Sequence, residues 1–253
     1  MKFFLFISIF ISAFCSLSAQ FDSNTNFINA SNGTSSNFGI QTVSNNSNFA
    51  RVQSYGAKFD DGSSGNDPDT VGSPYMNDEY QLGSIIKDSL VYADNIAVKY
   101  QVLEDYFIGK LSLTTNDEEA RVIIKSQDYK IKMGDKLFVA LPSIENSGNL
   151  EYFQILVIGN KGTLYKKNKK IFKPRIMATT SLTKNSPPTF KDDEEYYFGD
   201  FNGNFTKVPT SKKKILELFE NNKKEVSAVI KKNKLNLKKE EDLIRLFRFY
   251  ETL

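Results

Sequence analysis

The sequence contains a single cysteine, Cys15, which lies near the end of an apolar N-terminal run, and it contains no histidine or tryptophan. A fold built from the residues after Cys15 therefore has no disulfide and must be held together by its core. The same absence excludes Ser-His-Asp and Cys-His catalysis, zinc sites with His or Cys ligands, and haem or iron–sulfur centres held by these residues. Chemistry is left to carboxylates, Lys, Tyr, Ser, Thr or a hard metal ion on oxygen ligands, and no cofactor is predicted.

The first nineteen residues have the order of a secretory signal peptide. Lys2 supplies the positive start, residues 3–14 form the apolar run, and Ala19 is a small residue at the expected cleavage point. The run is shorter than the ~20 residues of a membrane-spanning helix. Lipidation of Cys15 is the rival interpretation, which the bulky residue before it disfavours. We therefore expect cleavage of residues 1–19 and an exported protein that is periplasmic, associated with the outer envelope or secreted.

Residues 20–70 are dominated by Asn, Ser, Gly, Thr and Asp, with few aliphatic side chains. This composition buries too little apolar surface to offset the entropy of an ordered chain, so it predicts a disordered arm. Its spaced phenylalanines, Phe49 among them, follow neither a helical nor a strand period. A Gly-containing stretch with four carboxylates could hold calcium, but it lacks the EF-hand spacing and is more typical of a solvated turn. The four are Asp60, Asp61, Asp67 and Asp69.

Residues 71–208 predict a β-rich domain, because β-branched and aromatic runs alternate with turn residues. The clearest period of two extends from Ile96 to Val102. Strands about ten residues apart with such turns indicate an antiparallel meander, open or partly rolled. The predicted strands cover residues 79–86, 95–103, 121–126, 129–133, 136–141, 151–158, 163–167, 195–198 and 204–208.

Residues 209–253 change to a helical period. Leu243, Leu246, Phe247 and Tyr250 recur at the spacing of one helix face. Because short helices are marginal alone, we expect two or three of them to pack on the β domain. The predicted fold class is therefore α+β, with a β-meander followed by short C-terminal helices.

A run of seven basic residues without an acidic one, residues 161–175, is the candidate contact for an anion or a partner. The competing interpretation is a sheet edge, with Leu164 and Ile171 inward and the lysines outward, where they would block edge-to-edge pairing. The chain as a whole carries a formal charge of only +3, which gives no case for nucleic acid. The candidate residues are Lys161, Lys166, Lys167, Lys169, Lys170, Lys173 and Arg175.

Two further charged stretches are candidate functional elements. The acidic run Asp192–Glu195 could supply a carboxylate pair for glycan hydrolysis, although adjacent acids usually form a solvated entry to a strand. Residues 211–253 carry twelve basic and seven acidic residues, a net charge of +5, and a basic amphipathic stretch can bind an anionic membrane. Packing of this stretch on the sheet is the simpler interpretation. The binding hypothesis gains support only if the basic run shares a face with these helices.

The order of several segments resembles a family of small exported proteins of unknown function in Gram-negative bacteria. The segments are GSPYMNDEYQLGSI, NIAVKY, EYFQILVIGNKGTLYKKNKKIFKP, PPTFKDDEEYYF and KKNKLNLKKEEDLIRLFRFYETL, within residues 72–253. The resemblance implies an exported location and a β-rich body with a Lys-rich helical C-terminus. It implies no catalytic residue.

The leading functional hypothesis is a non-enzymatic envelope or extracellular binding or structural module. Its partner would be an envelope protein, a glycan or a lipid head group, with no transmembrane helix after signal removal. The alternatives are a carboxylate-based glycan hydrolase and a peripheral membrane-surface protein that uses basic residues. The sequence leaves the oligomeric state open.

Overall fold

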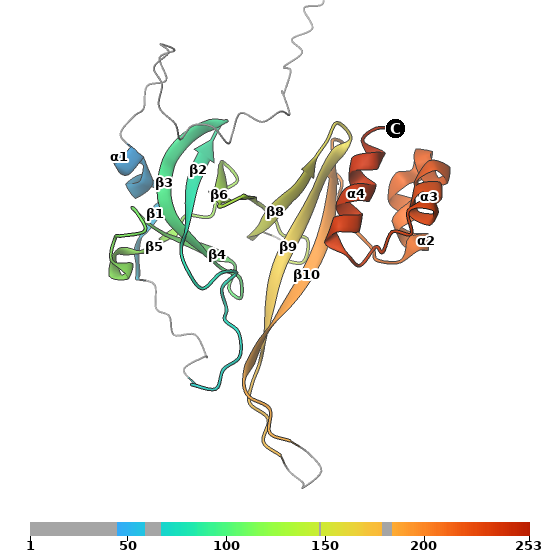
Figure 1. Cartoon of the computed structure of the whole chain (residues 1–253). Helices are drawn as coiled ribbons and strands as arrows, with labels where there is room; N and C mark the ends of the chain where they lie inside the picture. Colours follow the sequence, from blue (N-terminus) through green and yellow to red (C-terminus); the bar gives the residue numbers. More distant parts are fainter. Residues whose placement is uncertain (1–44, 59–66, 147, 179–183) are drawn as a thin grey trace, which may run out of the picture. The chain divides into compact units, whose positions relative to one another are not determined.

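The computed structural model describes residues 45–58, 67–146, 148–178 and 184–253 (Figure 1). The predicted signal peptide lies outside this part of the chain, as do residues 20–44 and 59–66 of the predicted arm. Among the described residues, no helix combines the length and the apolar character needed to cross a membrane.

The strands form one antiparallel sheet in the order β1-β5-β4-β3-β2-β6-β7-β8-β9-β10-β11. Two meanders meet where β2 pairs with β6: strands β2 to β5 extend the sheet in one direction and β6 to β11 in the other. The sheet is open, with β1 and β11 as its edges, which confirms the predicted meander. The strands are β1 (Gln53–Lys58), β2 (Gln81–Lys87), β3 (Leu90–Gln101), β4 (Tyr106–Lys110), β5 (Arg121–Ile123), β6 (Tyr129–Met133), β7 (Lys136–Pro142), β8 (Leu150–Ile158), β9 (Gly162–Lys173), β10 (Thr189–Asp200) and β11 (Phe205–Lys207).

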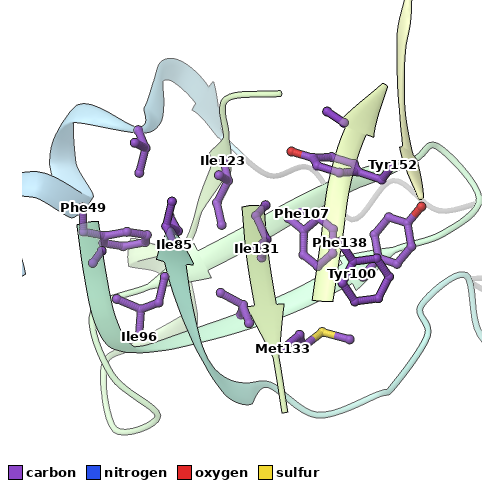
Figure 2. Close-up of a cluster of buried hydrophobic side chains, with 14 of the residues drawn as sticks. Phe49, Ile85, Ile96, Tyr100, Phe107, Ile123, Ile131, Met133, Phe138 and Tyr152 are labelled. Atoms are coloured by element: carbon purple, nitrogen blue, oxygen red, sulfur yellow. The ribbon is translucent and has the colours of Figure 1, made fainter. Parts of the chain in front are cut away.

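The first meander packs around a core of aromatic and aliphatic side chains (Figure 2). The predicted inward face of β3 is buried at Ile96, Val98 and Tyr100, but Ala97 on the opposite face is buried as well. The rings of Tyr100 and Phe107 stack with centroids 4.4 Å apart, and Tyr152 of β8 meets Phe107 edge-on at 4.8 Å. Because β8 belongs to the second meander, this contact joins the two halves of the sheet.

The ordered fold begins before residue 71, which corrects the predicted boundary of the arm. Helix α1 (Asn45–Arg51) and strand β1 (Gln53–Lys58) lie within residues predicted to be disordered. Phe49 has no exposed surface and belongs to the first core, beside Ile85 and Ile96 in Figure 2. The prediction was wrong here because one fully buried aromatic side chain can fix a segment whose average composition is polar.

The C-terminal segment is helical, as predicted, and packs on the second meander. Its elements are α2 (Lys212–Ile215), the 3₁₀ helix η2 (Leu216–Asn222), α3 (Lys223–Lys232) and α4 (Glu240–Tyr250). The predicted stripe residues Leu243, Leu246 and Phe247 are buried in a second core that includes Leu164 of β9 and Phe198 of β10. A further 3₁₀ turn, η1 (Asp117–Glu119), lies between β4 and β5.

Candidate functional site

Strands β9 and β10 are much longer than the predicted runs 163–167 and 195–198. Strand β8 pairs with β9 only between residues 163 and 166, and β11 pairs with β10 only between residues 197 and 199. Residues 167–173 and 189–195 therefore continue as a two-stranded ribbon without a third strand of the sheet (Figure 1). We call these two segments the distal ribbon. The edge-strand interpretation of the basic run was wrong for residues 163–166, which lie between β8 and β10, and it applies only to the distal ribbon.

The basic run and the acidic run are cross-strand partners. In the register of β9 and β10, Lys170 faces Asp192 and Lys169 faces Asp193. Lys170 Nζ lies 3.0 Å from Asp192 Oδ1, and Lys169 Nζ lies 2.7 Å from Glu195 Oε2. The two features that the sequence presents as separate candidate sites therefore largely neutralise each other.

Lys161 and Lys166 contact helix α4. Lys166 Nζ lies 2.5 Å from Glu194 Oε1 and 2.8 Å from Glu240 Oε2 at the start of α4. Lys161 Nζ donates to the Tyr250 carbonyl at the other end of the same helix, at 3.0 Å. The basic run thus meets an acidic side chain and the carbonyl end of α4, where a cation is favourable. Glu194 and Glu240 balance the charge of Lys166, whereas Lys161 keeps its charge because its partner is a neutral carbonyl.

Arg175 binds the remnant of the predicted acidic turn. Its Nε donates to Asp67 Oδ2 at 2.9 Å, and its Nη2 donates to Asp67 Oδ1 at 2.7 Å and to Asp69 Oδ2 at 2.8 Å. The hydrogen bond from Arg175 lowers the pKa of Asp67. Two of the four carboxylates considered for calcium are therefore occupied by a guanidinium, and the other two, at positions 60 and 61, lie outside the described residues. No three acidic side chains group as a metal site in the part of the chain that the structure describes.

The carboxylate most perturbed by its surroundings is Glu195. Burial alone would raise its pKa, but hydrogen bonds from Lys169, Lys207 and Tyr197 outweigh burial and lower the pKa to about 2. Tyr197 Oη donates to Glu195 Oε2 at 2.8 Å, and Lys207 Nζ pairs with Oε1. A glycosidase general acid needs the opposite shift, toward neutrality. This environment fits a structural ion pair.

The far end of the distal ribbon has a different character. Ile176 and Met177 are each 63% exposed, and Ile171 is 47% exposed, which corrects its predicted inward position. Ile176 exchanges two backbone hydrogen bonds with Ser186, at 3.0 and 2.9 Å, so the hairpin geometry continues past both strands. Lys173, Lys184 and Lys191 are exposed on the same hairpin, and none of the three forms an ion pair with another described residue. We call these six residues the ribbon tip: Ile171, Lys173, Ile176, Met177, Lys184 and Lys191.

A cluster of polar side chains around Asp105 lies between the two halves of the sheet. This residue occupies the β3–β4 turn with a positive φ of 59°. Its carboxylate accepts hydrogen bonds from Tyr100 Oη at 2.5 Å, Lys125 Nζ at 2.8 Å and the Tyr152 backbone N–H at 3.1 Å. Lys167 Nζ also lies 3.0 Å from Asp105 Oδ2, as an ion pair that lacks the geometry of a hydrogen bond.

Lys167 is the most buried cation of the basic run. Its residue surface is 4% exposed, which corrects its predicted place among solvent-facing contact residues. Its Nζ lies 3.9 Å from Glu151 Oε2 and 5.4 Å from the centroid of the Phe153 ring. Burial lowers the pKa of Lys167 and outweighs the opposing effect of Asp105 and Glu151. Burial likewise raises the pKa of Tyr152.

Sequence reasoning missed Asp105, Lys125 and Glu151. Each lies on a different turn or strand, so no local spacing links them to Lys167. The sequence offers one signal of this cluster. Lys167 lies on a strand, between two positions whose side chains the alternation predicts to be inward. Tertiary pairing of distant strands brings these groups together.

No family model, curated protein or solved structure matches this chain. The segment-order resemblance to exported Gram-negative proteins therefore stays an expectation. Inference about function rests on the fold, the ribbon tip and the cluster around Asp105.

Proposed function

We propose that this chain is an exported, non-enzymatic binding module that contacts an anionic lipid surface through its ribbon tip. The observation that carries this proposal is the combination of exposed Ile171, Ile176 and Met177 with three cations that have no acidic partner among the described residues. Of the other six residues of the basic run, five form ion pairs within the chain and Lys161 donates to the Tyr250 carbonyl.

The chemistry of the ribbon tip matches the boundary between lipid head groups and acyl chains. Apolar side chains that enter this boundary gain the free energy of leaving water, about 25 cal/mol per Å². Basic side chains next to an anionic leaflet add about 1 kcal/mol each. Long lysine side chains place their ammonium groups at the head groups while their methylenes cover apolar surface.

The acidic run does not favour the hydrolase alternative. Alternate residues of a strand point to opposite faces, so neighbouring members of Asp192–Glu195 project apart. Three of the four, Asp192, Glu194 and Glu195, are held by lysines. These contacts support a structural role for the run.

The test is co-sedimentation of the full chain with vesicles of pure phosphatidylcholine and of phosphatidylcholine mixed with phosphatidylglycerol. We expect binding to the anionic vesicles, and a loss of at least tenfold in the double variant Ile176→Asp, Met177→Asp. The matched control is Leu90→Asp, Val91→Asp, because these two side chains are 73% and 54% exposed on another hairpin. Equal binding by both variants, or no binding to either vesicle, would refute the proposal. A cross-linker at positions 176 and 177 could also be tested in cell envelopes that lack accessible anionic lipid. Capture of a protein there would point to a protein partner instead.

A further inference from the structure

We propose that Lys167 and Asp105 condense to form an intramolecular amide bond, with Glu151 as the proton acceptor that starts the reaction. The bond would join strand β9 to the β3–β4 turn, and so would link the two meanders covalently. This inference is independent of the ribbon tip and of any ligand.

The two reacting side chains are already in contact. Lys167 Nζ lies 3.0 Å from Asp105 Oδ2, and Glu151 Oε2 lies 3.9 Å from the same Nζ. The side chains of Lys167 and Asp105 are 5% and 18% exposed, so bulk water has little access to the pair. Holding two reactants at such a distance replaces an encounter in solution, which can be worth effective molarities of about 10⁵ M or more.

The condensation balances without any other reactant. Glu151 relays one proton from the Lys167 ammonium to the Asp105 carboxylate, and the neutral Nζ then attacks Cγ of the resulting carboxylic acid. A C–N bond forms, one C–O bond breaks, and the departing hydroxyl leaves as water with a second proton from Nζ. The ammonium and the carboxylate become one neutral amide and one water, and nothing is oxidised or reduced.

The surroundings favour both halves of this reaction. Burial lowers the pKa of Lys167, which increases its uncharged, nucleophilic fraction. The Tyr100 hydroxyl, Lys125 ammonium and Tyr152 N–H all donate to the Asp105 carboxylate. Donors at these positions stabilise the negative oxygen of a tetrahedral intermediate. A buried ion pair is also costly to keep desolvated, and the amide removes both charges.

Lys125 is the alternative nucleophile, because its Nζ lies 2.8 Å from the same Oδ2. Its side chain is 25% exposed, against 5% for Lys167. No ion pair joins Lys125 to a second described carboxylate that could take its proton. We assign Lys125 to the role of hydrogen-bond donor.

The experiment is the intact mass of the purified full chain under denaturing conditions, followed by digestion and peptide sequencing. We expect the wild type to be lighter than its sequence by one water, and a branched peptide to link Lys167 with Asp105. Lys167→Arg should have its full mass, while Lys166→Arg, on the neighbouring residue, should still form the bond. Glu151→Gln should slow bond formation by roughly 10²-fold or more.

Each other outcome counts against the proposal. A folded wild-type chain with its full mass would overturn it, and this result needs no variant. A branched peptide through Lys125 would overturn the choice of nucleophile. Loss of water without a branched peptide would place the change elsewhere, for example as a cyclic imide at Asp61-Gly62, and would also refute the bond.

Discussion

Glu195 offers a quantitative test of how the acidic and basic runs stabilise the ribbon. Its carboxylate has a pKa of about 2 in the folded chain, against an ordinary value of 4.5. One pKa unit corresponds to about 1.4 kcal/mol, so the ionised form gains roughly 3 kcal/mol on folding. The side chain is 15% exposed but its partner Lys207 is 53% exposed, and solvent screening of that pair reduces the expected value to roughly 2 kcal/mol.

The perturbation is Glu195→Gln, which keeps the shape of the side chain and removes its charge. Because the folded pKa is depressed, the stabilisation is fully present above about pH 5 and is lost as the pH falls from the ordinary value through about 2. The difference in unfolding free energy between the wild type and Glu195→Gln should therefore be roughly 2 kcal/mol at pH 7 and should approach zero near pH 2. Urea unfolding followed by circular dichroism, repeated at several pH values, measures this difference.

The matched control is Asp193→Asn, on the same strand. Asp193 is exposed and forms no ion pair with another described residue, so its replacement should change stability little at any pH. A difference for Glu195→Gln that does not vary with pH would show that the loss comes from packing. No difference at pH 7 would refute the ion-pair argument altogether.

Two further substitutions test the fold. Phe49→Ala should lower the free energy of unfolding by about 3–5 kcal/mol, because Phe49 is fully buried in the first core; a change below about 1 kcal/mol would show that α1 is not part of the folded unit. Gly83→Ala should lower it by about 1–3 kcal/mol, since the added Cβ would lie 2.2 Å from the Lys132 carbonyl oxygen and 2.6 Å from Val98 Cγ2. Gly148→Ala is a control for loss of a flexible residue without a clash, because nothing lies within 4 Å of its added Cβ, although its positive φ adds some strain. Urea midpoints measure all three.

The sequence supports the fold class, most strands and the helical C-terminus, because these depend on local periodicity. The alternation from Ile96 to Val102 and the stripe around Leu246 both correspond to buried faces. Local reasoning fails where charge replaces apolar alternation. The distal ribbon has charged residues on both faces, so a pattern based on hydrophobicity predicts strands that end too early.

The candidate sites depend even more on tertiary structure. The basic run predicts a cluster of cations, but the positions of their partners, from Asp67 to Glu240, follow only from strand register and helix docking. Asp105 has no motif around it, and its importance follows from three hydrogen-bond donors and the Lys167 ammonium, which distant parts of the chain bring to one carboxylate. Exposure of Ile176 and Met177 is equally invisible in sequence, because similar residues elsewhere are buried.

The register between β9 and β10 has a consequence for how the chain chooses its pairing during folding. In most hairpins a buried apolar face rejects a shifted alignment, whereas the distal ribbon has few buried apolar side chains to do so. Here the charged residues of β9 are all basic and residues 192–195 of β10 are all acidic, so Lys170 would face Asp192 in the native register and Asp193 after a shift by one residue. Charge therefore attracts the two strands to each other without fixing their alignment, and a shift would break the ring contact between Phe172 and Phe190. High ionic strength during refolding should slow the pairing of the two strands, even under conditions in which the finished protein remains stable.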